Sequence, residues 1–214
     1  MYRFSPFLLL ALVAGCSGGG SIPDALSAIE GDAEHAYDVA LVEDYTQLAE
    51  TAGTIDAAWT DFRPTAEADG ASGTVLAGVD DAIAALVDSA GLEEGAAASG
   101  RAANGVSEFM PQLYDLYAPA VPSEVLALDY LGREVVLDGM DGDFTAAGSD
   151  VETLASTWES VRQAVLDAGG DAEATDFDAS VELLRSLAAG DDAQALIDEA
   201  NVNLELVDVL EGVF

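Results

Sequence analysis

Apolar residues recur at alternating spacings of three and four residues along most of the chain from Ile22 onward. Because an α-helix turns once every 3.6 residues, this spacing places them on one stripe of a helix. The two clearest stripes are Tyr45, Leu48, Ala52, Ile55, Trp59 and Phe62, and Phe144, Ala147, Val151, Leu154, Trp158, Val161 and Val165. Such stripes pack against each other in helical bundles, and the sequence shows no comparable runs of period two. An all-α fold is therefore predicted.

The second stripe repeats the first together with its flanks. A shift of 99 residues superimposes them, and a shift of 97 aligns the ends of the two halves. The superimposed pairs are Pro23 and Pro122, Asp44 and Asp143, Trp59 and Trp158, Arg63 and Arg162, Asn104 and Asn201, and Glu108 and Glu205. The sequence thus predicts a tandem duplication, with a first four-helix repeat over residues 22–118 and a second over residues 119–214.

The repeats predict about eight helices in an up-down arrangement. We expect them over residues 23–42, 45–67, 74–90, 95–117, 122–140, 143–168, 175–189 and 191–212. The 122–140 helix is apolar nearly all round, which indicates cover on more than one side. One joined array with this helix at its centre is therefore favoured over two independent bundles. On its core face, Gly132 and Gly139 replace Ala33 and Ala40 of the first repeat, which predicts a close helix contact.

The charge balance excludes some classes of partner. The chain has 41 Asp and Glu residues against six basic residues, all of them Arg, for a net charge of -35. Nucleic acids and anionic membrane surfaces would be repelled. Either a salty environment or recruitment of cations or a basic partner would explain the acidity. The carboxylates are spread along the chain without a long acidic run, which favours the halophilic explanation.

Few reactive side chains are available for catalysis. With one Cys, one His and no Lys, the chain is excluded from Schiff-base chemistry, paired-cysteine redox chemistry and Cys-rich zinc sites. Only carboxylates remain for acid-base work, and the sequence marks out no pair of them. We therefore predict a protein that is not an enzyme.

The N-terminus has the pattern of an export signal. Arg3 precedes an apolar run over residues 7–14, as in a secretory signal peptide, predicted here over residues 1–15. The sequence Val13-Ala14-Gly15-Cys16 resembles the lipobox of bacterial lipoproteins. This resemblance implies cleavage before Cys16, lipidation of Cys16, and an extracytoplasmic, membrane-anchored protein. Residues 16–21 would form a flexible tether. The resemblance also implies the outer membrane or cell surface rather than the inner membrane, because Ser17 and not Asp follows the cysteine.

His35 is the first candidate for a metal site, because Glu34 and Asp38 lie within one turn of it. A histidine with carboxylates in a helical bundle can bind a transition metal. Helical phase, however, turns His35 away from the apolar stripe of its helix, so an exposed surface histidine is expected. A haem held by His35 with Met110 or Met140 is a further alternative.

The duplicated helical architecture is similar to that of imelysin-like extracytoplasmic proteins, which carry a G-x-H-x-x-E motif. This chain departs from the motif, since Gly31 lies four residues before His35 and Asp38 takes the place of the Glu. The similarity therefore concerns shape and location.

Two kinds of residue pair recur in both halves at a spacing of four. Trp59 with Arg63, and Trp158 with Arg162, predict a structural clasp in which the arginine lies along the indole ring. The other recurring pairs, on the side of their helices opposite the stripe, are Asn104 with Glu108 and Asn201 with Glu205. They are expected to be surface pairs or contacts between the two halves, where they could converge on a ligand.

These features together predict a membrane-anchored lipoprotein of the cell envelope. Its helical domain would be a non-catalytic binding or scaffold module for an envelope protein or a small ligand, with no cofactor. The alternative is an envelope carrier that binds a metal ion or haem through carboxylates and His35.

Overall fold

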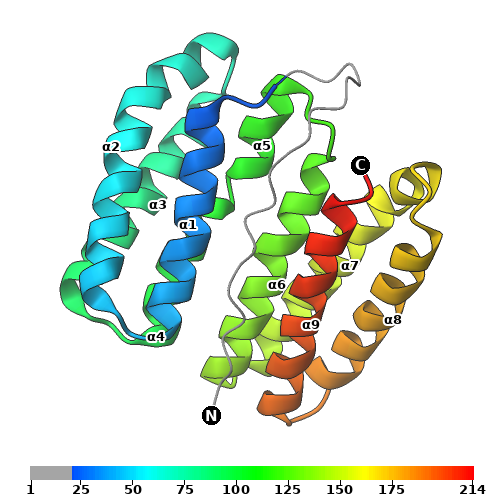
Figure 1. Ribbon diagram of the computed structural model, residues 1–214. Coiled ribbons are helices and arrows are strands. Elements are labelled where there is room, and N and C mark those ends of the chain that lie inside the picture. The colour runs from blue at the N-terminus through cyan, green and yellow to red at the C-terminus, as the bar shows by residue number, and fades with distance from the viewer. Residues whose placement is uncertain (1–20) are drawn as a thin grey trace.

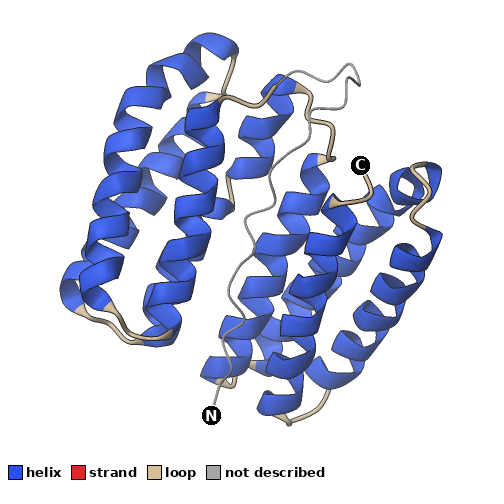
Figure 2. Cartoon of the chain, in the orientation of Figure 1, coloured by secondary structure: helices blue, strands red, loops and turns tan. Residues whose placement is uncertain are grey.

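The computed structural model describes residues 21–214 of the chain, and all of the regular structure in this part is helical (Figure 2). The prediction of an all-α array of bundles is confirmed. The predicted signal peptide and Cys16 lie outside the described residues. Within residues 21–214, none of the helices combines the length and the apolar character that crossing a membrane requires.

The helices form two bundles in which each helix packs against the next and the last closes against the first (Figure 1). The first bundle consists of α1 (Asp24–Leu41), α2 (Tyr45–Asp69), α3 (Gly73–Leu92) and α4 (Ala96–Ser107). The short helix α5 (Met110–Tyr114) and a 3-10 turn, η1 (Asp115–Tyr117), lead to the second bundle. That bundle consists of α6 (Ser123–Asp141), α7 (Phe144–Asp167), α8 (Asp171–Ala188) and α9 (Ala193–Glu211).

Helix α6 joins the two bundles. It packs against α7 and α9 of its own bundle and also against α4 and α5 (Figure 1). Its residues are divided accordingly, since Val125 and Leu128 are buried in the core of the second bundle and Leu137 in the core of the first. The central position predicted for this helix is confirmed.

The two glycines of α6 allow the close contact that the sequence predicts. A Cβ atom on Gly132 would lie 2.7 Å from Cδ2 of Leu204, and one on Gly139 would lie 2.7 Å from Cγ1 of Ile197. Both neighbours belong to α9. Real Cβ atoms do not approach other carbons so closely, so a larger residue at either position would force the facing side chain of α9 to move.

Most predicted helix ends are correct because they are fixed by local chemistry. Asp44 accepts a hydrogen bond from the backbone N–H of Gln47, and Asp143 caps α7 in the same way. Gly70 ends α2 with a φ of 112°, in the left-handed region that favours glycine.

Two predicted helices have different bounds in the structure. The helix expected over 95–117 is broken after Ser107, because Pro111 has no N–H and its ring conflicts with the carbonyl of residue 107. At the equivalent place in the second repeat stands Asp208, and α9 is continuous. Helix α8 begins at Asp171 rather than at residue 175, since acidic residues in a first turn interact favourably with the helix dipole.

Candidate functional site

Buried charged side chains are concentrated on the face of α6 that meets the first bundle. Arg133 and Glu134 are each 8% exposed, and Asp138 is 2% exposed. Burial of a charge is costly unless the charge is paired and hydrogen-bonded. The contact between the bundles is therefore the candidate site.

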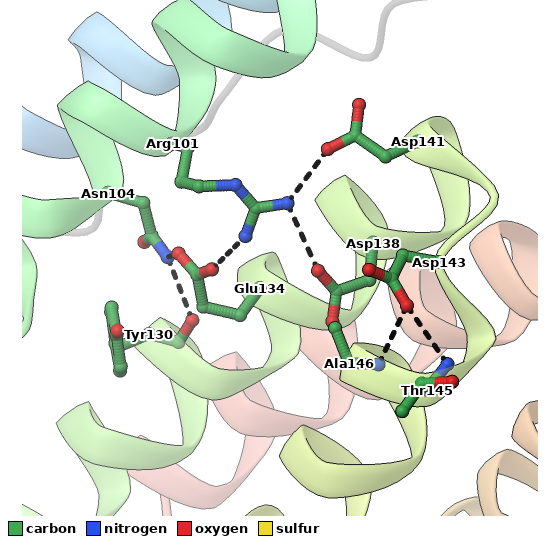
Figure 3. Close-up of polar contacts among 9 residues, drawn as sticks. All are labelled: Arg101, Asn104, Tyr130, Glu134, Asp138, Asp141, Asp143, Thr145 and Ala146. Carbon is green, nitrogen blue, oxygen red and sulfur yellow. Dashed lines mark hydrogen bonds and ion pairs between the residues drawn. The ribbon is translucent and has the colours of Figure 1, made fainter.

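One half of this contact is organised by two residues of α4 (Figure 3). Arg101 donates from Nη1 to Glu134, and from Nη2 to Asp138 at 3.0 Å and to Asp141 at 3.1 Å. Asn104, one turn further along α4, donates from Nδ2 to Oε1 of Glu134 at 2.8 Å and to the carbonyl oxygen of residue 130 at 3.0 Å. These hydrogen bonds fix the position of α4 on α6.

Carboxylates outnumber cations in this half. Glu134, Asp138 and Asp150 of α7 each place one carboxylate oxygen within 4.8 Å of the others. Burial, and after it the neighbouring carboxyl of Asp138, raises the pKa of Asp150 to about 7. An all-oxygen set of this kind has the ligand chemistry that hard divalent cations prefer.

The other half of the contact is organised by Arg133. Its Nη2 donates to Oε1 of Glu34 on α1 at 2.8 Å and to Asp129, one turn earlier on α6. Its guanidinium carbon lies 5.5 Å from the centre of the Tyr37 ring, a cation-π contact. One arginine of α6 thus holds a carboxylate and an aromatic ring of α1.

In each predicted Trp and Arg pair, both side chains donate hydrogen bonds to the same aspartate of the next helix. In the first bundle, Trp59 Nε1 donates to Asp80 at 2.6 Å and Arg63 Nε donates to the same carboxylate at 3.0 Å. The second bundle has the same arrangement around Asp178, with distances of 2.7 Å from Trp158 and 2.9 Å from Arg162. The clasp therefore runs through a shared carboxylate rather than through an arginine stacked on the indole.

The clasp of the second bundle borders a surface depression of about 290 Å³. Its arginines are already occupied, since Arg162 binds Asp178 and Arg185 binds Glu152 and Glu182. These ion pairs favour a structural role for the clasp over a ligand platform.

The predicted Asn and Glu pairs have different environments in the two bundles. Asn104 is fully buried in the contact with α6, whereas Glu108 is exposed. Asn201 and Glu205 are both exposed, and Asn201 donates to the backbone carbonyl of residue 197 at 2.7 Å. Of these four residues, Asn104 alone makes a hydrogen bond between the two bundles in the described part of the chain.

The structure does not bring the predicted metal ligands of α1 together. His35 is exposed, as its helical phase predicts, and Asp38 is exposed as well, while Glu34 is bound by Arg133. Within residues 21–214, one group of three His, Cys or carboxylate side chains lies close enough together to share an ion, and that group contains none of these residues. Of the two methionines considered for haem, Met110 is buried in the core of the first bundle.

Comparison with protein-family models, with curated proteins and with solved structures finds no match for this chain.

The central residues of this site were not predicted, although the sequence carries a signal for them. Asp129, Arg133, Glu134 and Asp138 are charged residues in the middle of a helix whose other central residues are mostly apolar. A helix covered on several sides must bury such residues, so they need partners of opposite charge from other helices. With only six arginines in the chain, Arg101 was a natural candidate for one of those partners.

We expect the protein to become more stable as the pH is lowered from 8 to 5. Burial, and next the nearby Glu34, raise the pKa of Glu30 from 4.5 to about 7, although Tyr114 donates a hydrogen bond to it and Arg133 also faces it. Between the unfolded pKa of 4.5 and the folded pKa of about 7, the folded state therefore binds more protons than the unfolded chain. The stabilisation is complete below the unfolded pKa and is lost as the pH rises through 7.

Glu30→Gln tests this expectation, because glutamine mimics the protonated carboxyl. The variant should be more stable than wild type at pH 8 by about 1–3 kcal/mol, with a flatter dependence on pH. Denaturant unfolding at several pH values and constant salt measures both effects. Glu50→Gln, at an exposed position of α2, removes the same charge and is the control. Parallel pH profiles for Glu30→Gln and wild type would contradict the prediction.

Proposed function

We propose that this protein is a membrane-anchored lipoprotein of the cell envelope, whose helical domain is a non-catalytic binding or scaffold module. The observation that carries the proposal is the lipobox-like sequence ending at Cys16, with a short Ser- and Gly-rich segment before the first helix at Asp24. A lipid chain on the cysteine and a helical domain a few residues later form a simple tethered module.

The polar groups of the bundle contact support a structural use of this domain. All five arginines of residues 21–214 form ion pairs with carboxylates. At the contact, Arg101, Arg133 and Asn104 are committed to holding α1, α4 and α6 together. Groups engaged in this way serve rigidity, which favours a binding or scaffold role over acid-base catalysis.

A tandem duplication is part of the proposal. The Trp, Arg and Asp clasp recurs in both bundles, on the second and third helices of each. Asp178 follows Asp80 by 98 residues, within one residue of the shifts that align the remaining pairs. A shared three-residue contact between the same two helices supports a common origin of the halves.

We also propose that the acidity is an adaptation to salt. The 41 carboxylates far outnumber the arginines, so most of them have no basic partner and are left to bind water and salt ions. High salt screens the repulsion among them.

Cys16→Ser tests the anchor. We expect the variant to leave the membrane fraction or to accumulate as an unprocessed precursor, because serine cannot accept the thioether-linked lipid. Membrane fractionation and intact-mass analysis of the N-terminus provide the readout. Ser17→Ala keeps the cysteine and should behave as wild type. A Cys16→Ser protein that is still cleaved and still anchored would show that the assignment is wrong.

A further inference from the structure

We propose that Glu134, Asp138 and Asp150 bind one divalent cation of the Mg²⁺ or Ca²⁺ type at the contact between the bundles. The proposal goes beyond the anchor and scaffold function and does not depend on it.

The three carboxylates have suitable spacing for a single ion. Glu134 and Asp138 are one turn apart on α6, and Asp150 approaches them from the neighbouring helix α7. One oxygen of each lies within 4.8 Å of the other two. Mg²⁺ and Ca²⁺ bind oxygen at about 2.0–2.6 Å, so one ion between these oxygens can reach all three after a small movement.

The charge balance at this place favours a cation. Arg101 supplies one positive charge to Glu134, Asp138 and Asp141, and Asp150 adds a further carboxyl next to Asp138. Carboxylates this close and this buried do not all ionise without a further positive charge. Either a proton or a metal cation supplies that charge. A divalent cation carries two positive charges and therefore neutralises more of the carboxylates' negative charge than one proton does.

An unpartnered oxygen supports the same conclusion independently. Asp138 is 2% exposed, and its Oδ1 accepts from Arg101. Its Oδ2 is buried and has no hydrogen-bond partner among residues 21–214. A buried carboxylate oxygen without a partner costs free energy, and an ion coordinated by Oδ2 would remove that cost.

The hydrogen bonds already present are compatible with the ion. Glu134 accepts from Asn104 and Arg101, one on each oxygen, but an ionised carboxylate offers about four acceptor positions. Arg101 and Asn104 thus orient Glu134 from the α4 side and leave acceptor positions free for an ion. Ligands that are all oxygens favour Mg²⁺ or Ca²⁺ over zinc, which prefers nitrogen and sulfur.

The test is a titration of the full chain, freed of chelator, with MgCl₂ and with CaCl₂ separately, followed by calorimetry and thermal unfolding. About 1 M NaCl reduces the Debye length to about 3 Å and suppresses diffuse binding to the acidic surface. We expect one saturable site per chain for at least one of the two ions, and a midpoint of unfolding that rises with its concentration.

Asp150→Asn should weaken this binding by about tenfold or more, since it removes a charged ligand. Asp176→Asn removes the same charge at an exposed position of α8 and should bind as wild type. Glu134→Gln, which keeps the size of the side chain, should show the same loss and decides the question if Asp150→Asn does not fold. Absence of saturable binding by wild type at pH 7.5 would overturn the proposal in favour of a shared proton. Equal binding by the Asp150, Glu134 and Asp176 variants would overturn it as well. Neither result bears on Cys16.

Discussion

Replacing Arg133 with Met is expected to destabilise the folded protein by about 3–5 kcal/mol. Arg133 binds Glu34 and Asp129, and its side chain is only 10% exposed. Methionine fills a similar volume but leaves both carboxylates without their cation. Burial already raises the pKa of Asp129 well above its usual value, so the loss of the arginine would favour its protonated form further.

Denaturant unfolding at pH 7 measures this effect, with Arg185→Met as the matched control. Arg185 also binds two carboxylates, but its side chain is 39% exposed and those of its partners are 66% and 74% exposed. Exposed ion pairs contribute little, so the control should lose about 1 kcal/mol or less. Adding Glu34→Gln to Arg133→Met should recover part of the stability, because it removes one unpaired carboxylate. Equal losses for the two arginine variants would show that burial of the Arg133 cluster is not important for stability.

Leu137→Ala is expected to cost about 2–5 kcal/mol and to destabilise both bundles together. Leu137 is fully buried, and although it belongs to α6 it packs in the core of the first bundle. Its truncation leaves a cavity where the bundles meet. If the array unfolds as one unit, each bundle should lose stability by the same amount.

The two tryptophans allow each bundle to be followed separately. Trp59 lies in the first core and Trp158 in the second, and the chain has no other tryptophan. Trp158→Phe therefore leaves a fluorescence reporter of the first bundle, and Trp59→Phe leaves one of the second. Leu137→Ala should shift both reporters equally, whereas Leu183→Ala, at a position 46% exposed on α8, should shift each by less than about 0.5 kcal/mol. A shift of the Trp59 reporter alone would show that the bundles unfold independently.

The helices were predictable because their signals are local. The spacing of apolar residues defines the buried stripe of each helix, and the caps at Asp44 and Asp143 depend on neighbours two or three residues away. The all-round apolar character of α6 indicated its central place, and Gly132 and Gly139 marked its close contact with α9. The break at Pro111 was missed although it too is local, because the apolar stripe continues through it.

The candidate site was not predictable from the same signals. Arg133 meets Glu34 across 99 residues, and Arg101 meets Glu134 across 33. Which charged residues face each other depends on how each helix is rotated and placed, and that is set by the packing of all the side chains between them. The sequence showed many carboxylates and few arginines, but it did not show which of them contact each other in buried positions.

Asn104 and Asn201 illustrate the difference between what the sequence determines and what the tertiary structure determines. Both occupy the same place in their repeats, yet Asn104 is fully buried and Asn201 is exposed. The sequence by itself determined that each lies on a helix, opposite the apolar stripe. The tertiary structure alone decided their environments, because α4 packs against α6 of the other bundle, whereas the outer face of α9 at Asn201 is exposed.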